Sequence, residues 1–277
     1  MADYQTIIYE KVEDKIFRIT LNRPEKINAL SPQLLAEFEH ATQAYDNDSE
    51  ASVLIIRGAG RGFCAGYDLA SDYGNAGAGR RYSVSRDFID CLRVTQRWQR
   101  LWSLTKPTIA QVHGYCLAGA NELVGHCDIV FASEDATFGH PAGRQLGVLP
   151  TMALWPALMG PRRAKEYFFT GDTFTGKQAE RWGLINRAFP RAQLESATLE
   201  YARRVALVSI ELLTLHKAAV NRFLEVMGFR AAEQSACDLD VIAHQTRAVR
   251  NWIELCREKG LREALEERDR PFKKLSP

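Results

Sequence analysis

A lone carboxylate, Glu122, stands among glycines and apolar residues in the stretch GANELVGHCD at 119–128. A strand-like run at 108–114 precedes it and another at 128–133 follows, so a helix is expected to begin near Gly119. Backbone N–H groups at a helix start are unpaired and can bind developing negative charge. An acid at that place also stabilises a helix without taking part in any reaction. Spacing alone favours this structural interpretation of Glu122.

A second polar group lies in the loop FGHPAGRQLGVLP at 138–150, which follows a short strand at 136–138. Its polar side chains are His140, Arg144 and Gln145. An imidazole titrates near pH ~6.5 and can act as acid or base. A loop histidine that hydrogen-bonds to the backbone explains His140 equally well.

The elements that would position these residues alternate between short strands and helices. The runs at 7–12 and 16–21 predict a hairpin, and 53–57 predicts a strand buried on both faces. Ser31 and Pro32 predict the start of a helix that runs to Tyr45. The remaining expected elements are a helix with an apolar stripe at 88–102, helices near 151–159, 161–169 and 176–182, a strand at 184–186, and long helical segments at 192–226 and 232–256.

Two glycine-rich segments invite separate interpretations. The segment GAGRGFCAG at 58–66 has the glycine spacing of a relaxed dinucleotide fingerprint, but it continues into a loop instead of a helix. We therefore interpret it as a loop that lets a ligand approach the backbone closely. The segment SDYGNAGAGR at 71–80 predicts a mobile loop.

Composition excludes several classes of protein. The 277 residues carry a formal charge of +2, which indicates neither nucleic-acid nor membrane binding, and no apolar run approaches the roughly 20 residues that span a bilayer. The six cysteines show no C-x-x-C spacing, which predicts reduced thiols and a cytoplasmic protein. The pairs His113 with Cys116 and His126 with Cys127 lack a matching second pair, so no metal site is predicted.

Motifs in order along most of the chain resemble the crotonase (enoyl-CoA hydratase/isomerase) superfamily. They are NRPEKINAL (22–30), GFCAGYDL (62–69), KPTIAQVHGYCLAG (106–119), Glu122, CDIVFA (127–132), ATFG (136–139), GLINR (183–187) and LEERDRPF (265–272).

This resemblance implies an α/β fold, a spiral of ββα units followed by a C-terminal helical region. Residues 1–190 would form the spiral core with the CoA groove and active site, and 191–277 the helical region, which would mediate trimerisation. The family usually assembles as trimers or dimers of trimers, so a homotrimer or homohexamer is expected. The substrate would be an acyl-CoA thioester, with no permanently bound cofactor.

The resemblance also implies roles for single residues. The backbone N–H groups of Tyr67 and Gly119 would form an oxyanion hole for a thioester enolate, and Glu122 matches one of the two catalytic glutamates of the hydratases. Because Tyr67 is larger than the usual residue, its ring must point aside or line the acyl pocket. The residues expected to contact CoA or the acyl group are Arg23, Lys26, Ala29, Ala65, Asp68, Leu69, Ala142, Arg144 and Arg268. For the cations among them, a solvated surface charge is the alternative.

The sequence departs from the hydratases where the second glutamate would stand, because that position is Ala142. Three hypotheses follow. The chain is an atypical hydratase or isomerase in which Glu122 acts alone or with His140. Alternatively, it is a C–C hydrolase, lyase or decarboxylase whose bulky or carboxylated acyl group is anchored by Arg144 or Gln145. In the third hypothesis, it only binds CoA esters.

Overall fold

The computed structural model describes residues 3–70, 83–148 and 154–275. The predicted mobile loop at 71–80 lies outside these ranges, as does the predicted start of a helix at 151. The fold that follows is that of the described residues.

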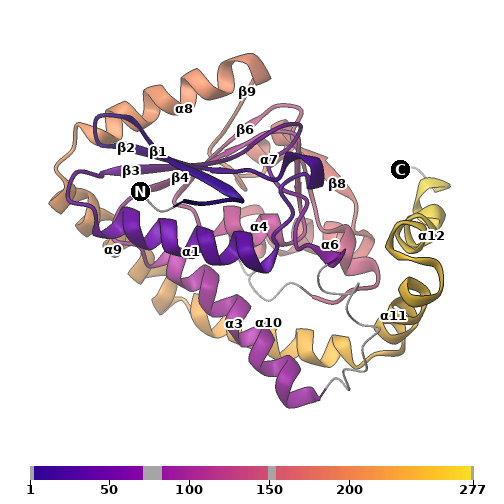
Figure 1. The fold of residues 1–277 in the computed structure, drawn as a ribbon. Helices are drawn as coiled ribbons and strands as arrows, with labels where there is room; N and C mark the ends of the chain where they lie inside the picture. Colours follow the sequence, from indigo (N-terminus) through magenta and orange to yellow (C-terminus); the bar gives the residue numbers. More distant parts are fainter. Residues whose placement is uncertain (1–2, 71–82, 149–153, 276–277) are drawn as a thin grey trace.

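The larger of two sheets has six strands (Figure 1). In spatial order they are β1 (Ile7–Glu13), β2 (Ile16–Leu21), β3 (Val53–Gly58), β4 (Thr108–Val112), β6 (Ile129–Ser133) and β9 (Arg187–Phe189). The hairpin pair β1 and β2 is antiparallel, as predicted, and every later pair is parallel. All residues of β4 are buried, because this strand is covered on both faces.

The smaller sheet consists of β5 (Tyr115–Leu117), β7 (Thr137–Gly139) and β8 (Thr173–Thr175). The chain leaves β4 and enters β5 through a sharp turn at Gly114, whose φ is +55°. It then forms helix α4 (Gly119–Gly125), so β4, β5 and α4 make one ββα unit. The strands β6 and β7 repeat the step from one sheet to the other. These two sheets and the helical C-terminal region confirm the predicted fold class.

Helices cover the larger sheet on both faces (Figure 1). On one face lie α1 (Pro32–Asn47), which begins at the predicted Ser31 cap, and α3 (Val84–Trp102). On the other face, α8 (Arg191–Ala206) packs Leu194 and Ala202 against apolar side chains of the sheet. Amphipathic helices thus bury both faces of the parallel strands.

The sequence misplaced several boundaries in the second half. The strand predicted at 184–186 is wrong, because the segment that pairs with β6 is β9, a few residues later. The two long helical segments are each divided, at 207–209 and at 245–246, whereas Gly228 and Gly260, which have positive φ, lie outside the predicted segments. The other helices are η1 (Pro24–Lys26), η2 (Pro141–Arg144), α5 (Leu154–Met159), α6 (Pro161–Thr170), α7 (Gly176–Arg181), α9 (Ile210–Val226), α10 (Phe229–His244), α11 (Arg247–Lys259) and α12 (Leu261–Lys273).

The predicted boundary near residue 190 and the trimerisation role of 191–277 stay predictions. The helix α8 shares a core cluster with the larger sheet, whereas α9 has no buried residue. Helix α9 instead exposes an apolar stripe that includes Leu212, Leu215, Phe223 and Val226.

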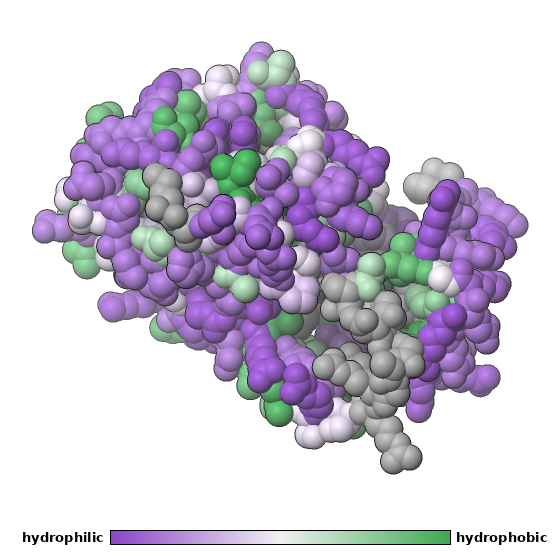
Figure 2. Space-filling view, in the orientation of Figure 1, coloured by the Kyte–Doolittle hydropathy of each residue, from purple (hydrophilic) through white to green (hydrophobic). Residues whose placement is uncertain are grey.

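The face in Figure 2 is mainly hydrophilic, with apolar residues scattered over it. Among the described helices, none combines the length and apolar character needed to cross a membrane.

Gly114 provides a test of the turn that joins the two sheets. A Cβ on Gly114 would lie 2.2 Å from the Arg61 carbonyl oxygen, whereas one on Gly228, also at positive φ, meets no atom within 4 Å. Gly228→Ala should lower the free energy of unfolding by about 1 kcal/mol, and Gly114→Ala by at least about 3 kcal/mol. Urea denaturation measures both, and equal losses would contradict the close packing at this turn.

Candidate active site

Two backbone segments meet at the start of α4. Gly66 has φ +96°, and a Cβ placed on it would lie 2.8 Å from the Leu117 carbonyl oxygen and 3.2 Å from the Gly119 nitrogen. The Leu30 N–H donates to the Gly66 carbonyl at 2.8 Å, and the Asp68 N–H donates to the Leu30 carbonyl at 3.2 Å. These contacts hold the segment around Tyr67 against the first residue of the helix.

The N–H groups of Tyr67 and Gly119 donate no hydrogen bond to any part of the chain that the structure describes. Gly119 is the first residue of α4, where an N–H has no acceptor within the helix. Ala118, just before it, has φ +49°, a conformation that L-residues seldom adopt. Two neighbouring unpaired N–H groups are the donors that an oxyanion requires.

The ring of Tyr67 lies directly against Gly119. A Cβ on Gly119 would be 2.5 Å from Cε2 of that ring, so only glycine allows this contact. The expected large side chain next to the hole therefore packs on the helix start and points its hydroxyl towards Glu122.

Glu122 is completely buried in the first turn of α4. Its Oε2 accepts a hydrogen bond from the Tyr67 hydroxyl, and that hydroxyl accepts one from Trp98 Nε1 at 3.0 Å. Burial, and next the charge of Glu122, raise the pKa of Tyr67 well above its usual value. Tyr67 therefore keeps its proton at neutral pH and donates a hydrogen bond to the carboxylate.

A buried hydrogen-bond chain fixes the other side of the helix. His126 Nδ1–H donates to the Glu122 carbonyl oxygen at 2.7 Å, and Nε2 lies 2.8 Å from Glu233 Oε1 of α10. Asn121 Nδ2 donates to the Gly139 carbonyl oxygen at 2.9 Å, which joins α4 to β7. These contacts fix the helix that carries Glu122 against α10 and against β7.

Sequence reasoning missed three of these side chains: Trp98, His126 and Glu233. Trp98 lies in the apolar stripe predicted at 88–102, and it is buried, with 0% exposure. Its N–H partner is 31 positions away in the sequence, and His126 and Glu233 are 107 positions apart. Local patterns carry no signal for such contacts, apart from the spacing that puts His126 one helical turn after Glu122.

The loop of the missing glutamate is largely apolar. Ala142 lies in η2 and packs in one cluster with Leu146, Leu69 and Trp252 of α11. His140 is also buried, with its ring edge-on to Phe168. Neither of its ring nitrogens has a hydrogen-bond partner within the described ranges.

Burial, opposed in part by the nearby backbone of Gly147, lowers the pKa of His140 to about 4. The imidazole is therefore neutral at pH 7. A neutral imidazole can accept a proton and so act as a base. It cannot act as an imidazolium acid at this pH, because the imidazolium form is not populated.

Arg144 is held by contacts with neighbouring parts of the chain. Its guanidinium donates to Asp172 Oδ1 at 3.1 Å and Asp269 Oδ1 at 3.0 Å, and its Nε donates to the Thr170 carbonyl oxygen at 2.8 Å. Its Cζ also lies 3.8 Å from the centre of the Phe272 ring. The arginine fastens η2 to α12, so a role as substrate anchor would require these bonds to break. Gln145 Oε1 is buried without a partner among the described residues.

Most predicted CoA-contact residues come together on two adjoining segments. The Ala65 N–H donates to the Ile27 carbonyl oxygen at 2.9 Å, and Arg23 Nη1 donates to Asp68 Oδ2 at 2.8 Å and to the Ala29 carbonyl oxygen at 2.7 Å. Lys26 at the end of η1 is exposed. It is the cation of this group best placed to meet a phosphate.

Arg268, one of the residues expected to contact CoA, is buried within this chain. It is 7% exposed, donates to both oxygens of Asp269, and lies 5.6 Å from the centre of the Trp252 ring. Within this chain its guanidinium packs between α12 and α11 and does not face solvent. Contact with a CoA nucleotide stays a prediction.

The two sheets, the helical C-terminal region and the buried carboxylate beside two backbone N–H groups define an α/β protein of the crotonase fold. The model of the enoyl-CoA hydratase/isomerase family matches residues 11–274. The hydroxycinnamoyl-CoA hydratase-lyase of Pseudomonas fluorescens is 35% identical over 198 residues, which cover 70% of this chain and 71% of that protein.

Solved structures agree with this match. An enoyl-CoA hydratase from Mycobacterium smegmatis superposes with a TM-score of 0.89 and 34% identity, covering 97% of this chain and 94% of that one. An enoyl-CoA hydratase/isomerase from Xanthobacter autotrophicus Py2 superposes with a TM-score of 0.89 and 35% identity. The match covers 97% of this chain and 99% of that one. The chain belongs to the enoyl-CoA hydratase/isomerase family, in the crotonase superfamily, whose members act on acyl-CoA thioesters.

The buried state of His140 predicts a pH dependence of stability. Its pKa is about 4 in the folded protein and ~6.5 in the unfolded chain, so between these values only the unfolded state binds the proton. Stability contributed by neutral His140 is complete above pH ~6.5 and is lost as the pH falls towards 4, by about 3 kcal/mol.

His140→Gln should remove this part of the pH dependence, whereas His40→Gln, at an exposed site, should not. Urea denaturation of each protein between pH 4 and 7 measures the difference. Parallel curves for wild type and His140→Gln would show that the imidazole is not held neutral by burial.

Proposed function

We propose that this chain is an enoyl-CoA hydratase or isomerase that works with one catalytic glutamate, Glu122. The observation that carries the proposal is the complete burial of Glu122 in the first turn of α4, the helix that begins at Gly119. Neither the Gly119 N–H nor the Tyr67 N–H has an acceptor in the described part of the chain. A thioester oxygen bound between those N–H groups becomes an enolate oxygen when charge moves from Cα, and each donor contributes about 3 kcal/mol to that state.

In this reaction, Glu122 moves the proton. In hydration, its carboxylate takes a proton from water as the water oxygen bonds to Cβ, and the enolate then receives a proton at Cα from the same carboxyl group. In isomerisation, it removes a proton at one carbon and returns it at another. The Tyr67 hydroxyl keeps the carboxylate oriented by its hydrogen bond to Oε2. Neutral His140 is the second group able to accept a proton.

A second candidate function is lyase or C–C hydrolase chemistry on a bulky or carboxylated acyl-CoA. It is favoured by the likeness to a hydroxycinnamoyl-CoA hydratase-lyase and by the apolar surroundings of Ala142. The bonds of Arg144 to Asp172 and Asp269 count against an anchoring role for that residue. The third hypothesis, binding without turnover, is weakest, because a wholly buried carboxylate without a role would be costly to keep.

The setting of the site supports further parts of the proposal. CoA would lie along the segments of Arg23 to Ala29 and Ala65 to Leu69, with exposed Lys26 towards its phosphates. The exposed apolar stripe of α9 supports assembly into a homotrimer or homohexamer, which would cover it. Six free thiols support a reducing, cytoplasmic environment.

Mass spectrometry on a panel of CoA thioesters tests the reaction. The panel runs from crotonyl-CoA to long-chain, branched and ring-bearing unsaturated esters, beside Glu122→Gln. Wild type should add one water to an unsaturated ester or move its double bond, and Glu122→Gln should lose at least about a thousandfold in rate.

The matched control is Glu50→Gln, at an exposed glutamate, which should keep full activity. Activity on an enoyl ester that persists in Glu122→Gln would overturn the role of Glu122. Products of C–C cleavage only would favour the second candidate function. Tight ester binding with no product from any ester would favour the third.

Tyr67→Phe tests the hydrogen bond to the carboxylate, because it keeps the backbone N–H and the ring. Loss of a hydrogen bond to a charged group should lower kcat about tenfold or more, with KM nearly unchanged. It should also shift the pH profile of kcat, since Glu122 loses its donor. Tyr115→Phe, at an exposed tyrosine, is the control. An unchanged kcat and pH profile would show that the Tyr67 hydroxyl has no influence on the reaction.

A further inference from the structure

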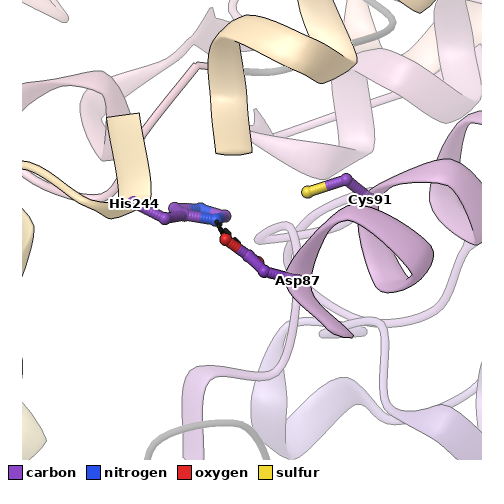
Figure 3. Close-up of side chains that lie close together, drawn as sticks. All are labelled: Asp87, Cys91 and His244. Atoms are coloured by element: carbon purple, nitrogen blue, oxygen red, sulfur yellow. Dashed lines mark hydrogen bonds and ion pairs between the residues drawn. The ribbon is translucent and has the colours of Figure 1, made fainter. Parts of the chain in front are cut away.

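Two packed helices each turn a pair of metal-ligand side chains towards the other. Asp87 and Cys91 are one helical turn apart on α3, and Asp240 and His244 are one turn apart on α10. Figure 3 shows Asp87, Cys91 and His244 converging from the two helices. Metal sites inside helical bundles are built from side chains that project inward from facing helices.

The distances suit a single ion. One ligand atom each of Asp87, Cys91 and His244 lies within 4.8 Å of the others. His244 Nδ1 is 3.0 Å from Asp87 Oδ1, and its Nε2 is 3.6 Å from Asp240 Oδ1. Ligands about 2.0 to 2.3 Å from a zinc ion lie about 3.3 to 3.7 Å from one another, so small rotations of the side chains would complete the geometry.

Burial and charge favour a cation at this place. Asp87, Asp240 and Cys91 are 2%, 7% and 7% exposed, so two carboxylates and a thiol share a largely dry space. Among the described groups in hydrogen-bond or ion-pair contact with both carboxylates, His244 alone can carry positive charge. A divalent ion would neutralise both carboxylates at once.

We propose that Asp87, Cys91 and His244 bind one divalent transition-metal ion of the zinc class, with Asp240 orienting His244. A ligand set of carboxylate, thiolate and imidazole matches the preferences of Zn²⁺ and of its spectroscopic substitute Co²⁺. His244 would coordinate through Nδ1 and donate its Nε2–H to Asp240, the arrangement in which a carboxylate fixes a metal-bound histidine.

Binding must release protons. The metal–sulfur bond forms on the Cys91 thiolate, so the thiol proton, which now points to Asp240 Oδ2 at 3.7 Å, passes to solvent. Nδ1 of His244 must also give up any proton that it shares with Asp87. No oxidation or reduction is involved, and each metal ion should release at least one proton.

The site has a structural connection to the loop that carries His140 and Ala142. Asp240 Oδ1 accepts a hydrogen bond from the Val148 N–H at 2.7 Å. A Cβ on Gly147 would lie 2.5 Å from the same oxygen and 3.1 Å from His244 Nε2, so the loop backbone covers the cluster closely. A bound ion would fasten α3, α10 and this loop together outside the proposed active site.

Cobalt titration of the full chain, after its metals are removed with a chelator, tests the proposal without any enzyme assay. One equivalent of Co²⁺ should bind at micromolar concentration and give a thiolate-to-cobalt charge-transfer band, which Zn²⁺ then displaces. Calorimetry in buffers of different ionisation enthalpy should show at least one proton released. Zn²⁺ should also raise the Tm.

The variants separate ligands from neighbours. Cys91→Ser should abolish the band, and Asp87→Asn or His244→Gln should raise the Kd at least about tenfold. The control is Cys237→Ser, a buried cysteine of α10 in the same apolar cluster as Cys91, which should keep the band. The proposal is overturned if wild type binds Co²⁺ only at millimolar concentration, or if the band survives in Cys91→Ser. It is also overturned if Cys237→Ser abolishes the band while its circular dichroism stays that of wild type.

Discussion

The hydrogen bond from the Tyr67 hydroxyl to the Glu122 carboxylate is the contact around which the site is arranged. A carboxylate with no exposure to solvent needs hydrogen-bond donors to compensate for its lost hydration. Tyr67 supplies one, and the Trp98 N–H holds the tyrosine in turn. Gly119 is required because the same ring occupies the space where its side chain would be. One bulky residue thus supports the carboxylate and covers the start of the helix.

The rest of the core keeps this contact in place from two directions. The ββα unit brings α4 to the end of the smaller sheet, where Asn121 ties it to Gly139 of β7. At the C-terminal end of α4, His126 joins the Glu122 backbone to Glu233 of α10. The C-terminal helices are therefore part of the support of the site, and Arg144 connects them to η2 through Asp269. The loop with Ala142 stands where the hydratases have their second glutamate. It contains apolar contacts and one neutral imidazole, that of His140.

The sequence predicted the class of fold, the hairpin, the start of α1 and the position of Glu122 in the first turn of α4, because these depend on local patterns and ordered motifs. It predicted β7 as a short strand at 136–138 but did not predict β5 and β8, because a strand of three residues carries only a weak pattern. It placed the strand at 184–186 too early, and it did not predict the helix breaks at 207–209 and 245–246, where no glycine marks the end of a helix. The bond between Tyr67 and Glu122 and the cluster of α3 and α10 had no local signal, because their members come from distant segments. The same reason explains why no metal site was expected from Asp87, Cys91 and His244.

The most direct measurement of the central claim is exchange of hydrogen at Cα in heavy water. A saturated acyl-CoA cannot be hydrated, but an enzyme that holds its enolate and moves a proton with Glu122 will exchange the Cα hydrogen for deuterium. Mass spectrometry of butyryl-CoA and of longer or aryl-substituted saturated esters should show a gain of deuterium with wild type and none above background with Glu122→Gln. Exchange that proceeds equally in the variant, or no exchange with any ester that binds tightly, would contradict the assignment of Glu122 as the proton carrier of this site.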